Sequence, residues 1–415
     1  MWIRYIFVLI LSVQLLLVNV WPHVAHASTE EPEIQADSGV LMDMKTGQVL
    51  WSKNPEKHHY PASITKILTA ILALENSKLD EPVRTSQLAT EQEGNRVYLV
   101  EGEEEPMKEM LYGLLLNSGN DAAVAIAEHV AGTEENFANM MNEKARDIGA
   151  THSHFVTPNG LHDPDHYTTA QDMALIARYA MQNETFRQIV STKYYPWKGK
   201  QWQSELVNLN KILWTYDGAN GIKTGFTDQA HQTIVASAKR GDQEFLVCLM
   251  YGLTQQSIRD DASKLLDYGF NNFTTRTIAK KGESVTRITY KDDVDTDVLI
   301  GNDVTYTFRK DESAPVERVL HIQKPVPPFS HGTVLGTIEF EQAGKVIASA
   351  PLVAAKDVPK LHSAWLYVLP AFPLFLFGWI WYRLRLRTFR SKRIQNQNYY
   401  QKSFRSTSNE ANSGS

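Results

Sequence analysis

The stretch Pro61-Ala62-Ser63-Ile64-Thr65-Lys66-Ile67-Leu68 decides how this sequence is interpreted. Apolar residues recur behind Ser63 at helical spacing, which predicts a helix over residues 63–74. Positions i and i+3 share a helix face, so the amine of Lys66 can reach the hydroxyl of Ser63. A serine needs an adjacent base to act as a nucleophile, and a lysine can be that base when burial or a neighbouring cation lowers its pKa. The stretch therefore predicts an activated serine at a helix N-terminus, where free N–H groups favour a developing oxyanion.

Ser-x-x-Lys alone also fits a capped surface helix, so two later motifs carry the prediction further. Ser118-Gly119-Asn120 lies between two predicted helices, and Lys223-Thr224-Gly225 lies just before two predicted strands. Both motifs are duplicated, as Ser52-Lys53-Asn54 and Lys45-Thr46-Gly47, but those copies precede Ser63. The earlier Lys-Thr-Gly has the composition of a plain turn. Only the later copies follow Ser63 in the order of the penicillin-recognising serine enzymes.

The segments around these motifs give a wider resemblance. Residues 61–66, 111–123 and 221–227, and residues 157–161 together with 167–170, resemble the serine-type D-alanyl-D-alanine carboxypeptidases. These are the low-molecular-mass penicillin-binding proteins, and the similarity runs from about residue 35 to 355. The resemblance implies an α+β catalytic domain of the penicillin-binding transpeptidase-like, or β-lactamase-like, fold. It also implies a small all-β domain after the catalytic domain.

Three catalytic roles follow from the resemblance. Ser63 would attack the D-Ala-D-Ala carbonyl and form an acyl-enzyme, with Lys66 as the general base. Ser118 would relay a proton between the lysine and the leaving amine. No cofactor and no metal are implied.

The substrate-binding roles come from the same resemblance. Asn120 would hydrogen-bond the substrate amide, and Lys223 would meet the terminal carboxylate with help from Thr224. Gly225 would let the substrate lie close along the strand. The backbone N–H groups of Ser63 and Phe226 would form the oxyanion hole.

The sequence departs from many relatives at two places. Ala230-His231 stands where they have Ala-Gly, and Phe226 occupies a variable position. We expect these departures to affect the rate or the substrate preference, and we do not infer a loss of activity.

The implied function is removal of the C-terminal D-alanine from peptidoglycan stem pentapeptides, which limits cross-linking. The partners are then stem peptides, and β-lactams as covalent inhibitors. Three alternatives stay open. The first is a β-lactamase, although the Glu-x-x-Leu-Asn segment usual for that class is not present. The second is a zinc hydrolase built on the histidines of residues 152–166, and the third is a non-catalytic penicillin-binding sensor or scaffold.

The pattern of apolar runs predicts the domain organisation. An apolar hairpin over residues 38–51 and two strands near 232–251 enclose helices at 107–116, 121–130 and 169–181. This arrangement predicts an α+β domain over residues 35–270, with a sheet built from both of its ends. Alternating residues from Val304 onward predict the small β-rich domain over residues 275–355.

Both ends of the chain carry addressing signals. Residues 1–27 have an apolar core and end in Ala25-His26-Ala27, as a signal peptide does. Residues 364–382 form an apolar run with aromatic ends, and six basic residues follow, so we predict a transmembrane helix with the catalytic domain outside. Residues 383–415 would be a basic and then disordered cytoplasmic tail.

The composition agrees with an exported, folded enzyme. Of 415 residues, 43% are hydrophobic, and the formal net charge is only −5. That charge, with no long basic stretch before the C-terminus, argues against nucleic acid as a partner. The single cysteine, Cys248, excludes an internal disulfide and lies in an apolar run, so we predict a buried strand residue.

Overall fold

The computed structural model describes residues 31–290, 294–360 and 365–409. The predicted signal peptide, residues 1–27, lies outside these residues and stays a prediction. The described chain forms two compact units. The first comprises residues 31–279, 304–317 and 341–348, and the second comprises the remaining segments.

The first unit is built on a five-stranded antiparallel sheet in the order β2-β1-β9-β8-β7. Its strands are β1 (Ser38–Asp43), β2 (Val49–Lys53), β7 (Ala219–Thr227), β8 (His231–Arg240) and β9 (Gln243–Gly252). The predicted hairpin and the predicted strand pair are confirmed, and β1 pairs with β9, so the sheet is built from both ends of this domain. Cys248 is fully buried in β9, as predicted.

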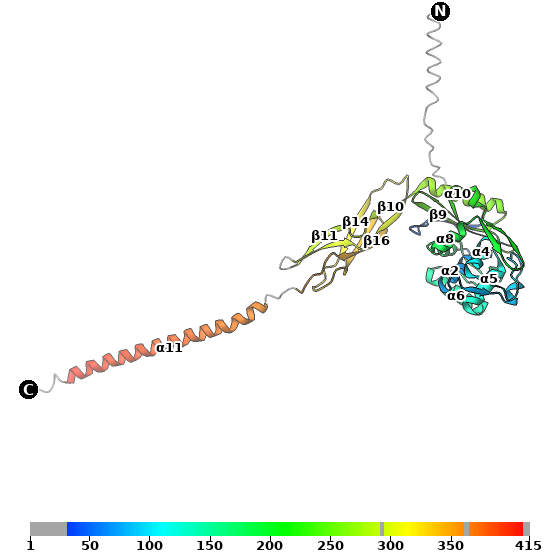
Figure 1. The fold of residues 1–415 in the computed structure, drawn as a ribbon. Coiled ribbons are helices and arrows are strands. Elements are labelled where there is room, and N and C mark those ends of the chain that lie inside the picture. Colours follow the sequence, from blue (N-terminus) through cyan, green and yellow to red (C-terminus); the bar gives the residue numbers. More distant parts are fainter. Residues whose placement is uncertain (1–30, 291–293, 361–364, 410–415) are drawn as a thin grey trace, which may run out of the picture. The chain divides into compact units, whose positions relative to one another are not determined.

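Helices cover both faces of this sheet (Figure 1). The longer ones are α2 (Lys66–Asn76), α4 (Met107–Leu116), α5 (Asn120–Ala131), α6 (Glu134–Ile148), α7 (Ala170–Ala180), α8 (Glu184–Ser191) and α10 (Gln255–Asn272). The first six share one hydrophobic core with one face of the sheet. The seventh, α10, packs on the opposite face, and a capping box between Thr254 and Ser257 holds its first turn. The predicted α+β architecture is confirmed.

Smaller elements complete the unit. They are the 3₁₀ turn η1 (Ala62–Thr65), the short helices α3 (Gln87–Thr90) and α9 (Ile212–Thr215), and the antiparallel pairs β3–β4 (Pro82–Arg84, Glu104–Pro106), β5–β6 (Tyr194–Lys198, Gln203–Val207) and β10–β13 (Phe273–Ala279, Val304–Arg309).

Sequence periodicity misplaced two features. The helix expected from Ser63 begins as η1 and becomes α-helical only at Lys66. Lys223-Thr224-Gly225 was placed before the strands but lies inside β7, at the edge of the sheet. The strand has no apolar–polar alternation to reveal it, because its residues are glycine, small or polar apart from Ile222 and Phe226.

The second sheet of the molecule has five antiparallel strands in the order β11-β12-β16-β15-β14. Its strands are β11 (Ser284–Thr289), β12 (Asp295–Ile300), β14 (Val316–Ile322), β15 (Val334–Gln342) and β16 (Lys345–Ala354). Alternate residues of β12, such as Val298 and Ile300, are buried. The sequence predicted alternation from Val304 onward, which is β13, and burial does not alternate along that strand.

The C-terminal helix bears on two predictions. A single helix, α11, runs from Trp365 to Asn409, so the tail from Gln395 is helical where disorder was expected. No glycine or proline interrupts it after Gly378, and an established helix extends at one hydrogen bond per residue. Among the residues that the structure describes, no helix is both long and apolar enough to cross a bilayer, so the transmembrane helix predicted at 364–382 is not found.

Candidate active site

Ser63 lies in the 3₁₀ turn η1, and α2 begins directly after this turn, at Lys66. The Lys66 Nζ is 2.9 Å from the Ser63 Oγ. Ser63 is half-buried and lines a cleft, whereas Lys66 is completely buried beneath it. The i, i+3 contact that the sequence suggested is therefore present, although a 3₁₀ turn and not an α-helix carries it.

The surroundings of Lys66 determine what its amine can do. Besides the Ser63 hydroxyl, Nζ contacts the Asn120 Oδ1 at 2.7 Å and the Asn159 carbonyl oxygen at 2.6 Å. Both of these oxygens can only accept. A neutral amine has two hydrogens, so donating to both leaves its lone pair for the Ser63 O–H.

The protonation of Lys66 agrees with this arrangement. Burial, and then the positive charge of Lys223, hold the pKa of Lys66 well below the usual lysine range. A lysine with a lowered pKa supplies a neutral amine, which is what a general base requires.

Ser118 and Asn120 enter the site from the connection between α4 and α5. Ser118 has a left-handed backbone, with φ of 61°, and its hydroxyl is almost fully buried. Asn120 is the first residue of α5, and its Nδ2 donates to the Glu93 carbonyl at 2.5 Å. The side-chain oxygen of Asn120 is thus turned toward Lys66 while its nitrogen holds the preceding loop.

Lys223 reaches the same centre from the edge strand β7. Its Nζ donates to the Ser118 Oγ and to the Thr224 carbonyl, each at 3.0 Å. Burial lowers the pKa of Lys223 to about 7. Ser118 therefore contacts one buried lysine and lines the same cleft as Ser63.

Gly225 determines how closely β7 approaches the serine. A Cβ placed on Gly225 would lie 2.7 Å from the Ser63 backbone nitrogen and 2.5 Å from the Thr233 Oγ1. A real Cβ essentially never comes that close to another atom, so only glycine fits without movement. The strand and the nucleophile are in direct backbone contact here.

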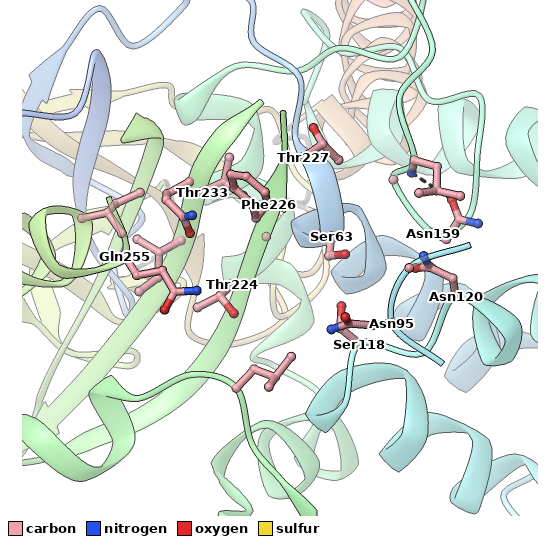
Figure 2. Close-up of a pocket in the computed structure, with 18 of the residues that line it drawn as sticks. Ser63, Asn95, Ser118, Asn120, Asn159, Thr224, Phe226, Thr227, Thr233 and Gln255 are labelled. Carbon is pink, nitrogen blue, oxygen red and sulfur yellow. Dashed lines mark hydrogen bonds between the residues drawn. The ribbon is translucent and has the colours of Figure 1, made fainter. Parts of the chain in front are cut away.

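These residues surround a cleft of about 480 Å³. Figure 2 shows Asn120 and Asn159 on one side of Ser63, and Thr224 and Phe226 on the other. The Phe226 side chain is 54% exposed at this cleft. Of the eight predicted site residues, Lys66 and Lys223 lie beneath the cleft, and the other six line it: Ser63, Ser118, Asn120, Thr224, Gly225 and Phe226.

The sequence can now be compared with those of known proteins. A family model described as D-alanyl-D-alanine carboxypeptidase matches residues 25–252, which is more than half of the chain. This chain belongs to the D-alanyl-D-alanine carboxypeptidase family. A second model, described as the C-terminal domain of penicillin-binding protein 5, matches residues 273–360.

Individual relatives agree with the family models. The D-alanyl-D-alanine carboxypeptidase DacF of Bacillus subtilis is 32% identical over 342 residues, covering 80% of this chain and 88% of its own. The structure of penicillin binding protein 5 from Haemophilus influenzae matches with a TM-score of 0.72 at 29% identity, covering 80% of this chain and 99% of its own. A mutant DD-transpeptidase of Streptomyces matches with a TM-score of 0.56 at 31% identity, covering 58% of this chain and 99% of its own.

The comparisons confirm three predictions. The family and the enzyme class are those expected from the motifs. The fold is the penicillin-binding transpeptidase-like fold, followed by a C-terminal all-β domain.

Sequence reasoning missed several residues of this carboxypeptidase site. Asn159 belongs to a segment noted only for its resemblance to the family, although its carbonyl contacts the catalytic lysine candidate. His166 was considered only as part of a possible zinc site. It does not line the cleft, yet it is 1% exposed and contacts Thr65 beside the catalytic lysine candidate. The cations Lys211 and Arg259 also line the cleft, and no local motif marks them.

The histidines that suggested a zinc hydrolase have other partners. His166 contacts Thr65, His154 contacts the Asp165 carbonyl, and the His162 ring packs edge-on against Tyr60. His231, the departure from the family pattern, has φ of 54° and lies against the Tyr251 ring, with 4.3 Å between the centroids.

Proposed function

We propose that this carboxypeptidase hydrolyses the terminal D-Ala-D-Ala bond of peptidoglycan stem pentapeptides through an acyl-enzyme on Ser63. The observation that carries the proposal is the 2.9 Å contact between the Lys66 Nζ and the Ser63 Oγ, with the other two contacts of Nζ made to acceptors. That set leaves the lone pair of a neutral Lys66 for the serine proton, as general-base catalysis requires.

Acylation then follows from the positions of the side chains. The Ser63 Oγ attacks the carbonyl carbon of the penultimate D-alanine while its proton moves to the Lys66 Nζ. The C–N bond to the last D-alanine breaks, and Ser118 donates its proton to the leaving amine while it takes one from Lys66, which returns to the neutral form. The Lys223 Nζ, 3.0 Å from the Ser118 Oγ, supports that transfer electrostatically.

Recognition of the substrate is proposed from charge and geometry. Asn120 binds the substrate amide, and the backbone N–H groups of Ser63 and Phe226 stabilise the oxyanion. Lys223 and Thr224 attract the terminal carboxylate. Lys211 and Arg259, which line the same cleft, add positive charge for this group.

Hydrolysis of the ester completes the cycle. Water attacks the acyl carbon, and the Ser63 Oγ leaves with a proton, which releases the shortened tetrapeptide. The shortened stem no longer carries the D-Ala-D-Ala bond needed for donating a cross-link. A β-lactam acylates the same oxygen, but its leaving group stays tethered, so it inhibits the enzyme covalently.

The domain organisation is part of the proposal. Residues 35–270 form the catalytic domain, and residues 275–355 form the β-rich domain. After removal of residues 1–27, the enzyme works on the cell wall outside the membrane. The exposed apolar side chains of α11, among them Phe375 at 82% and Phe377 at 78% exposure, attach it to the membrane.

Mass spectrometry of a penicillin adduct tests the proposal. The full chain should gain the mass of one penicillin at Ser63, and the Ser63→Ala variant should gain none. The wild type should also release D-alanine from a pentapeptide, with or without a chelator. A label on another residue would overturn the assignment.

The same assays separate the alternatives. Stable acylation without D-alanine release would indicate a sensor or scaffold. Rapid turnover of the penicillin itself would indicate a β-lactamase. Loss of D-alanine release on addition of chelator would indicate a metal-dependent hydrolase.

A further inference from the structure

The segment of residues 156–161 passes over the first turn of α2 and presents two carbonyl groups to it. The Asn159 carbonyl accepts from the Lys66 Nζ at 2.6 Å, and the Pro158 carbonyl accepts from the Thr69 Oγ1 at 2.6 Å. Gly160 makes the fit close: a Cβ there would lie 1.9 Å from the Ala62 carbonyl oxygen. A small displacement of this segment therefore moves an acceptor of the catalytic amine.

His166 links this segment to η1. Its Nδ1 lies 3.1 Å from the backbone nitrogens of both Val156 and Thr157, which donate to it. Nδ1 must therefore be unprotonated, and the ring proton is on Nε2. The Nε2–H faces the Thr65 Oγ1 at 3.0 Å, and Thr65 stands directly before Lys66 in the chain.

The imidazole is held in this neutral form. It is 1% exposed, and burial lowers the pKa of His166 to about 3. A protonated ring would place an N–H at Nδ1, against two backbone donors. The tautomer follows from the fold, without any contact to the cleft.

We infer that His166 is a positioning residue, whose neutral imidazole holds the segment of residues 156–161 against Thr65 so that the Asn159 carbonyl keeps the Lys66 lone pair directed at Ser63. The inference rests on the proposed acyl-enzyme function. His166 touches neither the reacting atoms nor the cleft lining, so it acts through Asn159 and Lys66.

Two substitutions of His166 separate positioning from mere filling of space. In His166→Asn, the Oδ1 stands near the position of Nδ1 and can still accept from Val156 and Thr157. In His166→Gln, the amide lies near the position of Nε2, so Thr65 keeps a partner but the two backbone donors lose theirs. Both changes remove the buried ring, so they are matched for lost packing.

The measurement is the second-order rate constant for acylation of Ser63 by a fluorescent penicillin, with the thermal midpoint recorded for each full-length variant. His166→Gln should acylate at least about tenfold more slowly than wild type, because a misplaced base loses up to about 100-fold. His166→Asn should stay within about threefold, because the segment keeps its anchor. The exposed His154 gives the control: His154→Asn and His154→Gln should both acylate like the wild type.

The outcomes are distinct. Equal acylation by His166→Asn and His166→Gln, whether both are normal or both are slow at similar thermal midpoints, would overturn the positioning role. A wild-type chain that is not labelled at Ser63 would instead overturn the proposed function. Slow acylation by His166→Gln with rescue by His166→Asn supports the inference.

Discussion

Two buried lysines lie at the centre of the site, and catalysis asks for opposite charge states from them. In the proposed mechanism, Lys66 is neutral to accept the serine proton, and Lys223 is charged to support the leaving amine and the carboxylate. Burial lowers both pKa values, and the charge on Lys223 lowers that of Lys66 further. The fold therefore helps the lysine that must lose its proton and works against the one that must keep it.

A bell-shaped pH dependence of kcat/KM follows. Activity should fall at low pH as Lys66 becomes protonated, and it should fall above about pH 7, where Lys223 loses its proton in the free enzyme. In Lys223→Arg the guanidinium stays charged at these pH values, so the basic limb should disappear. D-alanine release measured across pH checks this, and an unchanged basic limb in Lys223→Arg would assign it to another group.

The duplicated Lys-Thr-Gly motif supplies a matched comparison for Lys223. Lys223→Ala removes a buried cation and the partner of Ser118, so kcat/KM should fall by about 10²–10³. Lys45→Ala changes the exposed lysine of the earlier copy and should leave kcat/KM unchanged. A comparable loss from both substitutions would contradict the choice of the later motif.

At the residue scale, the sequence predicted the three motifs because their side chains are specific in type and spacing. It did not predict Asn159 as a contact of Lys66, because a backbone carbonyl carries no sequence signal. Nor did it assign His166, since burial of a loop histidine depends on contacts between segments about 100 residues apart. The roles of all these residues remain predictions that the variants above test.

At the element scale, the contact between β7 and η1 determines where the nucleophile lies. Gly225→Ala should push the strand away from Ser63, lowering the free energy of unfolding by about 1–3 kcal/mol and slowing acylation at least about tenfold. Gly149→Ala, at the left-handed end of α6 with open space around it, should destabilise the chain without slowing acylation. Penicillin labelling and urea unfolding measure both effects, and normal acylation by Gly225→Ala would show that the strand can move without consequence.

The link between His166 and the segment of residues 156–161 also predicts an acid-dependent stability. The folded ring stays neutral down to about pH 3, whereas the unfolded ring protonates below pH 6.5. Between these values the unfolded chain binds more protons, so the free energy of unfolding falls as the pH falls. From pH 7 to pH 5 the wild type should lose about 2 kcal/mol more than His166→Asn, at about 1.4 kcal/mol per pH unit below 6.5. Urea unfolding at the two pH values tests this, with His154→Asn expected to behave like the wild type.

The elements themselves were predictable to different degrees. Strands β8 and β9 and helices α4, α5 and α7 have regular apolar patterns, and the structure has them close to the expected positions. Helices α6, α8 and α10 were not predicted, although side-chain caps at Thr133, Asn183 and Thr254 mark their starts. Strand β7 was not recognised in the sequence. A strand is identified by alternating apolar and polar residues, and β7 instead carries the proposed substrate-binding residues.

At the scale of the whole molecule, the predicted site residues all come from one compact unit. They are drawn from η1, α2, α5, β7 and the connections between elements, spread over about 160 residues. The sheet brings β7 to its edge, the position at which an extended peptide can pair with a sheet. Sequence alone predicted the α+β class from its terminal strands, but the edge position of β7 depends on long-range pairing with β8.

The attachment of the enzyme to a membrane is the last prediction, and it belongs to the whole chain. Phe375 and Phe377 are 82% and 78% exposed on α11, and basic residues follow from Arg383. Apolar side chains next to positive charge favour binding to an anionic bilayer surface. The double substitution Phe375→Asp and Phe377→Asp should therefore lower co-sedimentation with anionic vesicles several-fold, while D-alanine release from a soluble pentapeptide stays unchanged. The control is Val326→Asp, at a side chain that is 89% exposed in the second unit; this variant should bind vesicles like the wild type. Equal binding by the wild type, the double variant and Val326→Asp would rule out attachment through this part of α11.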